Sequence, residues 1–157
     1  MTYETGFEVP PERQEVIITR LFGASPERVF AAHVDATLIP LWWGPRYLTT
    51  DVERLEARPG GQWRYIQRAA DGAVHAFHGV FHLVDAPRRL VTTFEYEGTP
   101  GQVLLNDVRF EAVTEGTRLI QKSVYLNVAD RDAMVQAGMR GGLETSMERL
   151  DELFAAS

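Results

Sequence analysis

The stretch "DRDAMVQAGMRGGLETSMERLDELF" (Asp130–Phe154) decides the fold, because it predicts one long helix with a single apolar face. Asp130 is the expected N-cap of this helix. Apolar residues recur every three or four positions, the period of a helix that is buried on one side. They are Val135, Met139, Leu143, Met147, Leu150 and Phe154. Such a helix must bury its apolar face against another element, which the rest of the chain has to supply.

Segments rich in β-branched and aromatic residues supply that surface. "EVIITRLF" (Glu15–Phe22) predicts a first strand. Turns rich in Gly, Pro and Asp separate the later segments, and connections this short make consecutive strands antiparallel neighbours. The later segments are Tyr47–Leu55, Gln62–Arg68, Val74–Val84, Arg89–Tyr96, Val103–Val113 and Thr117–Asn127.

Two short helices are expected between the first strand and the next. Ser25 is a good N-cap and Pro26 suits the first helical position. Asp35 can cap a second helix that runs toward "PLWWGP" (Pro40–Pro45), where Pro40 keeps it short and Gly-Pro ends it. With the strands and the long helix, this order predicts an α+β architecture.

Composition limits the class of protein. The 157 residues suit one domain, 1–157, of which residues 1–13 are polar and expected to be loosely held. No apolar run approaches the ~20 residues of a membrane span, and the first residues lack the pattern of a secretory signal. The chain has no cysteine, so we expect a cytoplasmic protein. Its net charge of −6 argues against a nucleic-acid partner.

Alternation along the strands predicts which side chains face the helix. The direction of Val74–Val84 is ambiguous; we favour Phe77, Gly79, Phe81 and Leu83 inward, although a bulge could invert part of this strand. In the other strands the inward set is Trp63, Tyr65, Gln67, Leu90, Thr92, Phe94, Tyr96, Leu104, Asn106, Val108, Phe110, Leu119, Gln121, Ser123 and Tyr125.

Polar residues occur within this inward set at Asn106, Gln121, Ser123 and Tyr125. Buried polar groups need partners, so these side chains bond to one another, hold ordered water, or meet a ligand. The sequence leaves these alternatives open. Three glycines in the long helix, Gly138, Gly141 and Gly142, permit either close packing on the sheet or contact of a ligand with the helix backbone; we favour packing.

The residues also resemble a known family. "SPERVFAAHVDATLIPLWWGP" (Ser25–Pro45) is similar to the opening of the bacterial proteins related to the C-terminal domain of the Hsp90 ATPase activator, in the START/Bet v 1-like (SRPBCC) superfamily. Further similar stretches follow in the family's order and cover nearly the whole chain. They are "PGGQWRY" (Pro59–Tyr65), "HGVFHLVDAPRRLVTTFEY" (His78–Tyr96), "GTRL" (Gly116–Leu119) and "GGLETSMERLDEL" (Gly141–Leu153).

The resemblance implies a helix-grip fold, with a seven-stranded antiparallel sheet curved around the C-terminal helix and a cavity between them. It places the corner Trp43-Gly44-Pro45 at one end of that cavity. We expect Trp43 to pack inward and Trp42 to cover the cavity mouth or the surface. The family often has tryptophan where this chain has Leu143, and the smaller side chain would enlarge the cavity.

Three functions are compatible with these patterns. The first is binding of a small, mostly apolar molecule. The second is a cyclase- or aromatase-like enzyme, for which Tyr65 and Tyr125 are the only inward acid or base candidates we find. The third is contact with a chaperone, which the family name suggests and which a chain too short for a second domain weakens. The residues expected to line the ligand site are Trp43, Trp63, Tyr65, Phe77, Phe81, Phe94, Tyr96, Asn106, Phe110, Gln121, Ser123, Tyr125, Met139 and Leu143.

Metal and cofactor chemistry find no support in the sequence. His75, His78 and His82 would stand too far apart on a strand to share an ion, since His78 and His82 are separated by about 13 Å. His33 is expected to be a surface or cap residue. "GMRGGLETS" (Gly138–Ser146) lacks the lysine that ends a phosphate-binding loop. We therefore expect no metal and no cofactor, and we identify no catalytic constellation.

Overall fold

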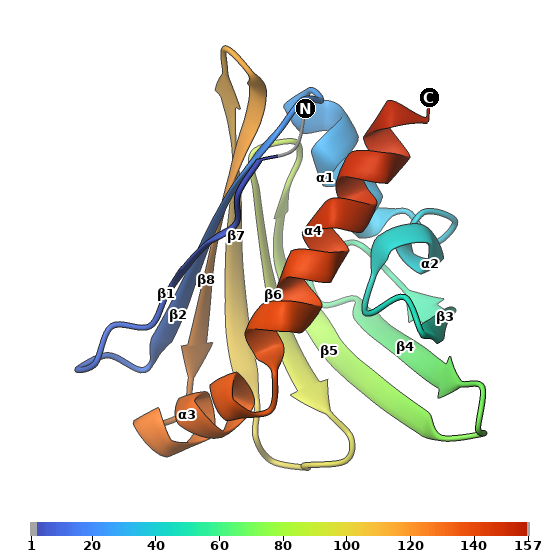
Figure 1. Cartoon of the computed structure of the whole chain (residues 1–157), viewed down its shortest axis with the longest axis vertical. Helices are drawn as coiled ribbons and strands as arrows, with labels where there is room; N and C mark the ends of the chain where they lie inside the picture. The colour runs from blue at the N-terminus through green and yellow to red at the C-terminus, as the bar shows by residue number, and fades with distance from the viewer. Residues whose placement is uncertain (1–2, 157) are drawn as a thin grey trace.

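An antiparallel sheet curves around the C-terminal helix of this chain, as the computed structural model of residues 3–156 shows (Figure 1). The eight strands follow the order β1-β2-β8-β7-β6-β5-β4-β3 across the sheet. Their bounds are β1 Gly6–Glu8, β2 Glu15–Phe22, β3 Leu48–Leu55, β4 Gln62–Ala69, β5 Val74–Asp85, β6 Arg89–Tyr96, β7 Leu104–Val113 and β8 Gly116–Tyr125. The α+β helix-grip prediction is confirmed.

The number of strands differs from the predicted seven. The additional strand, β1, pairs with β2 at the edge of the sheet. It is only three residues long and lies within the polar segment 1–13, where no apolar alternation predicts a strand. The other strand boundaries agree with the sequence prediction to within one or two residues.

Four helices lie on the concave side and at the ends of the sheet (Figure 1). Ser25 caps the first, α1, as predicted, since its hydroxyl accepts a hydrogen bond from the Arg28 amide at 3.3 Å. Asp35 accepts from the amide and hydroxyl of Thr37, and so it caps the turn before α2 rather than α2 itself. The helices are α1 Pro26–Val34, α2 Ile39–Trp42, α3 Val128–Gln136 and α4 Met139–Ala155.

The single long helix that the sequence predicts is broken into α3 and α4. Gly138 lies between them with φ +94°, a left-handed conformation that ends one helix before the next begins. Asn127, rather than Asp130, caps α3, because its side chain accepts from the amide of Asp130. The apolar face is retained in α4, where Met147 and Leu150 are buried and Leu143 packs against the core.

The set of β5 side chains that faces inward changes partway along the strand. Phe77, Gly79 and Phe81 face inward as expected, but the register with β6 shifts between Phe81 and Leu83. After this bulge Leu83 is 37% exposed, and Val84 packs against the core in its place. The prediction for Leu83 is therefore wrong, for the reason that the sequence left open.

A buried ion pair fixes α4 on the first long strand. Arg20 on β2 is 1% exposed, and its guanidinium pairs with the carboxylate of Asp151, with one nitrogen–oxygen distance of 3.2 Å. The same guanidinium donates to the backbone carbonyl of Leu21. At the other side of the helix, Arg149 donates to the carbonyl of Gly44 at 2.9 Å and ties the Trp-Trp-Gly-Pro corner to α4. Among residues 3–156 we find no helix that is long and apolar enough to cross a membrane.

Candidate functional site

A pocket of about 720 Å³ lies between α4 and the concave face of the sheet. Strands β3 to β8 supply its walls, α1 and α2 close one side, and α3 and α4 contribute Met134 and Met139. Tyr47 is among the lining residues and is 77% exposed, so the pocket opens to solvent beside it. The volume lies within the range of small-molecule sites, about 300–1,000 Å³.

Aromatic rings form one wall of the pocket. The ring of Trp43 contacts Tyr65 and Phe77 edge-on, with both centroid distances at 5.1 Å, and Trp63 lies 4.6 Å from Tyr65. Gly79 makes room for Trp63: a Cβ there would stand 2.5 Å from the indole nitrogen, which donates to the carbonyl of Thr93 at 3.1 Å. The wall is therefore a set of contacting rings from β4, from β5 and from the residue that follows α2.

The prediction for the two neighbouring tryptophans is wrong for Trp42, which we expected at the cavity mouth or the surface. Trp42 is only 6% exposed, and its indole nitrogen donates to the carbonyl of Ala32 at 2.8 Å. It is a core residue that also reaches the pocket, not a surface cover. Trp43 does point inward, but it is half-buried and faces the pocket. Sequence adjacency shows that the two indoles diverge, and only the packing of α2 decides which of them is enclosed.

Polar side chains on β7 and β8 form a hydrogen-bonded group in the pocket. Ser123 donates to the side-chain oxygen of Asn106 at 2.6 Å. The amide nitrogen of Gln121 lies 3.2 Å from the Ser123 hydroxyl and 3.4 Å from the same Asn106 oxygen. The first of the three alternatives that the sequence left open therefore occurs for these three residues, which bond to one another. The fourth, Tyr125, instead directs its hydroxyl to the sulfur of Met139 at 3.2 Å. The hydrogen bonds within the group of three do not use every donor and acceptor atom of those side chains.

Among the described residues, the pocket lacks acidic side chains and the strongly basic side chains of lysine and arginine. Burial raises the pKa of the Tyr65 and Tyr125 phenols, which keeps both protonated. Burial also lowers the pKa of His33 to about 4, although its hydrogen bond to the carbonyl of Val29 acts in the opposite direction. The charge distribution therefore favours an uncharged occupant.

Two histidines are among the lining residues that sequence reasoning missed, together with Ile39, Tyr47, Leu48, Met134, Thr145 and Ser146. His33 was expected at the surface, but its ring packs between Trp42 and Phe110 and lines the pocket. Its Nδ1 lies 2.7 Å from the carbonyl of Val29 and must donate, because a carbonyl only accepts. His75 lines the pocket on the same face of β5 as Phe77, and this shared alternation was the signal that could have found it.

Two helix glycines face open space rather than the sheet. A Cβ built at Gly141 or Gly142 would meet no atom within 4 Å, and both residues line the pocket. Close packing, the explanation that we favoured from the sequence, is therefore wrong for these two positions. Their lack of side chains leaves room in the pocket beside the first turns of α4.

All the residues predicted for the ligand site line this pocket except Phe110. Phe110 is 3% exposed and packs edge-on against Phe30 at 5.2 Å and against His33. Alternation correctly placed it on the concave face. However, α1 covers that end of the sheet, so Phe110 is a core residue. Whether the remaining residues bind a ligand stays a prediction.

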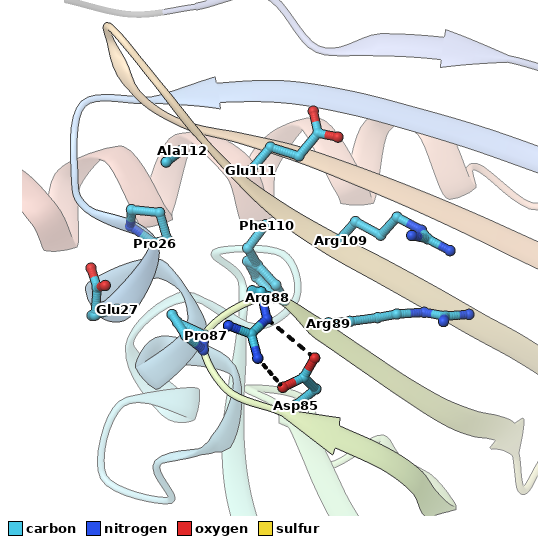
Figure 2. A pocket seen from close by; sticks show the side chains of 10 residues that line it. All are labelled: Pro26, Glu27, Asp85, Pro87, Arg88, Arg89, Arg109, Phe110, Glu111 and Ala112. Carbon is cyan, nitrogen blue, oxygen red and sulfur yellow. Dashed lines mark hydrogen bonds and ion pairs between the residues drawn. The ribbon is translucent and has the colours of Figure 1, made fainter.

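A second hollow lies on the outer side of the molecule, between the start of α1 and the β5–β6 turn (Figure 2). Figure 2 shows the Arg88 side chain turned onto Asp85, at distances of 3.3 and 2.9 Å. Arg89 is likewise paired, with Asp107 on β7. Since Glu27 and Glu111 also border the hollow, its charges are largely balanced within the protein. We therefore assign function to the interior pocket.

The histidines of β5 do not converge on an ion. His78 lies on the outer face between Glu95 and Glu97, at 3.3 and 2.9 Å, and His82 is exposed. Within residues 3–156, no group of three or more His, Asp or Glu side chains is arranged to hold a metal. The strand assignment that separated these histidines is confirmed.

Several solved structures of bacterial proteins have a similar fold. A crystal structure from Rhodobacter sphaeroides is 26% identical, with a TM-score of 0.90 over 98% of this chain and 100% of the other. A crystal structure from Mycobacterium smegmatis is 23% identical, with a TM-score of 0.88 over 98% of each chain. The AHSA1 protein of Silicibacter pomeroyi is 22% identical, with a TM-score of 0.75 over 90% of this chain and 98% of the other. No curated protein gives a significant match.

The two similarities below 25% identity show the fold alone. The family is shown by a sequence profile, because the profile described as "Activator of Hsp90 ATPase homolog 1-like protein" matches residues 23–155. That range includes all four helices and the strands from β3 to β8. The chain belongs to the family of Activator of Hsp90 ATPase homolog 1-like proteins, with the helix-grip fold of the SRPBCC superfamily.

Proposed function

We propose that this protein binds a small, uncharged, mostly apolar molecule in the pocket between α4 and the sheet. The observation that carries the proposal is the lining: aromatic and aliphatic side chains with a few polar groups and, within residues 3–156, no charged side chain. Burying a charged ligand without a partner is costly, whereas aromatic surface gains from leaving water. The open space at Gly141 and Gly142 adds support, because glycine otherwise weakens a helix.

Two dyes of the same skeleton test the choice of an uncharged ligand. N-phenyl-1-naphthylamine is uncharged, and 8-anilinonaphthalene-1-sulfonate carries an additional sulfonate. We expect a fluorescence titration to give at least tenfold tighter binding of the uncharged dye. Equal binding of both dyes would contradict the proposal, because a surface patch does not discriminate in this way.

A pair of variants on α4 places the dye in the pocket. Gly142→Leu adds a side chain that projects into the pocket, and it should weaken binding of the uncharged dye at least tenfold. Glu148→Leu places the same leucine side chain at an exposed position of the same helix and should leave binding unchanged. Thermal melts of both variants confirm that they are folded. Loss of binding in both variants, or in neither, would place the dye elsewhere.

An acid–base enzyme of the cyclase or aromatase kind is the second candidate, and His33 is the observation that favours it. Since Nδ1 donates to the Val29 carbonyl, Nε2 carries no proton in the neutral ring and is available as a base. The low pKa of about 4 makes this a weak base at neutral pH. Binding is therefore the better-supported function. Chaperone contact rests on the name of the family alone.

A further inference from the structure

Two separate groups of hydrogen-bonding side chains lie in the same pocket. The first, which we call the β7–β8 polar group, consists of Asn106, Gln121 and Ser123. The second, the β5–β6 polar pair, consists of His75 and Tyr96. Each is hydrogen-bonded internally, and no hydrogen bond joins one to the other among the described residues.

The β7–β8 polar group has a donor and an acceptor that its internal hydrogen bonds do not use. The Asn106 side-chain oxygen accepts from Ser123 at 2.6 Å and from Gln121 at 3.4 Å. An asparagine side chain also carries two N–H donors on its nitrogen, and a glutamine carries a carbonyl oxygen. The hydrogen bonds within the group use neither the Asn106 nitrogen nor the Gln121 oxygen. These atoms are available to a ligand at this end of the pocket.

The β5–β6 polar pair also has a donor left over. Nδ1 of His75 and the hydroxyl of Tyr96 are 2.8 Å apart. If the tyrosine donates, the histidine retains its Nε2 proton; if the histidine donates, the tyrosine retains its hydroxyl proton. In both tautomers one N–H or O–H is unused by the pair. The backbone of Gly98 packs closely on the Tyr96 ring, since a Cβ at Gly98 would lie 2.5 Å from that ring.

The sheet register gives the separation of the two groups. Thr92 on β6 lies opposite Asn106 on β7, and Tyr96 is four residues further along β6. Four residues of a strand span about 13 Å. Between these positions the pocket is lined by the rings of Phe94 and Phe77, whose centroids are 5.5 Å apart.

We propose that the ligand is an elongated, uncharged aromatic molecule with a hydrogen-bonding group at each end, one held by the β7–β8 polar group and the other by the β5–β6 polar pair. This inference rests on the proposed binding function and adds length and polarity to it. A ligand that is polar at one end only would leave one set of buried donors without a partner, which disfavours it. The apolar middle of the ligand lies against Phe77 and Phe94.

Three stilbenes of one shape test this proposal: trans-stilbene, 4-hydroxystilbene and 4,4′-dihydroxystilbene. Phenols have pKa values near 10, so all three are uncharged at pH 7. We expect each hydroxyl to tighten binding to the full-length protein by about fivefold, the range of one net hydrogen bond. Displacement of N-phenyl-1-naphthylamine from the pocket measures all three affinities.

Two variants assign the two ends of the ligand. The double variant His75→Leu/Tyr96→Phe removes both polar groups of the pair and should abolish the advantage of 4,4′-dihydroxystilbene over 4-hydroxystilbene. The double variant Asn106→Leu/Gln121→Leu should do the same from the other end, whereas Tyr3→Phe, which removes a hydroxyl outside the pocket, should leave the advantage intact. Thermal melts show whether the variants fold, and trans-stilbene, which needs neither polar group, should bind all of the proteins alike.

The outcomes separate this inference from the proposed function. Equal affinities for the three stilbenes in the unmodified protein would overturn the two-ended ligand while leaving a binding pocket in place. The same holds if the dihydroxy advantage survives both His75→Leu/Tyr96→Phe and Asn106→Leu/Gln121→Leu. Failure of the uncharged dye and of every stilbene to bind would instead overturn the binding function itself.

Discussion

The indole nitrogen of Trp42 lies 2.8 Å from the carbonyl oxygen of Ala32, and this hydrogen bond joins α2 to the last turn of α1. The Trp42 ring also packs 4.8 Å from the ring of His33, so the contact closes one end of the pocket. The next residue, Trp43, makes its ring contacts with β4 and β5 instead. One corner therefore supplies a core residue and a pocket residue from adjacent positions.

Replacement of the two tryptophans should have different consequences. Trp42→Ala removes a buried ring and its hydrogen bond, so we expect a loss of about 3–5 kcal/mol in the free energy of unfolding. Trp43→Ala should cost about 1–3 kcal/mol, because the half-buried ring leaves space that is continuous with the pocket. Urea denaturation of both variants measures this, and dye titration should show weaker binding by Trp43→Ala. A larger loss at Trp43 than at Trp42 would reverse our assignment.

The pKa of His33 predicts how stability depends on pH. The folded-state pKa of about 4 lies below the ordinary value of 6.5, so between these values the unfolded chain binds a proton that the folded chain does not. Stability should therefore fall as the pH is lowered from 6.5 to 4, by up to about 3 kcal/mol. Urea denaturation at pH 7, 6 and 5 tests this above the range in which carboxylates titrate.

Two variants assign that pH dependence to His33. His33→Phe retains a ring at the position and should flatten the dependence between pH 6.5 and 5. His82→Gln removes an exposed histidine on the outer face and should leave the slope as it is. An unchanged slope in His33→Phe would show that another group is responsible.

The ion pair between Arg20 and Asp151 predicts a large effect from removal of one charge. Asp151→Asn leaves the guanidinium of Arg20, 1% exposed, without its carboxylate, and this should cost about 3–5 kcal/mol. The double variant Arg20→Met/Asp151→Leu replaces both charges with apolar groups and should recover most of that loss. Chemical denaturation of the two variants gives both numbers. A double variant that is less stable than Asp151→Asn would show that the pair contributes more than mutual compensation of its charges.

Glycines on the two sides of the start of α4 should respond in opposite directions. Gly138→Ala places a side chain in a left-handed conformation with φ +94° and should cost about 1–2 kcal/mol. Gly141 lies within α4, and a Cβ added there meets no atom within 4 Å. Gly141→Ala should therefore stabilise the fold by up to about 1 kcal/mol. Thermal melts compare them directly. Stabilisation by both changes would mean that α3 and α4 can join into one helix.

The sequence predicts the sheet well because its signals are local. Alternation between core and solvent sides defines β4, β7 and β8, and short turns place them in antiparallel order. The edge strand β1 had no such signal, since three residues are too few to show a period. The break at Gly138 was missed because apolar spacing continues across it and only the backbone conformation interrupts the helix.

The pocket was predictable in outline but not in detail. Alternation identifies most of the residues on the concave face, and the majority of them line the pocket. It does not show which of them a helix covers, and so Phe110 was assigned to the pocket although α1 packs on it. The burial of His33 and the division between Trp42 and Trp43 depend on how α1 and α2 rest on the sheet, which involves residues far apart in sequence.

The open sheet leaves two edge strands, and both bear on the resistance of the protein to aggregation. An exposed edge can pair with the edge of another molecule when it is long, flat and apolar. β1 is only three residues long, and β3 contains a shift in register between Val52 and Arg54 that interrupts its pairing with β4. The exposed side chains of Asp51, Glu53 and Arg54 add charge to that edge. Both edges of the open sheet therefore disfavour pairing with a strand of another molecule, even at high protein concentration.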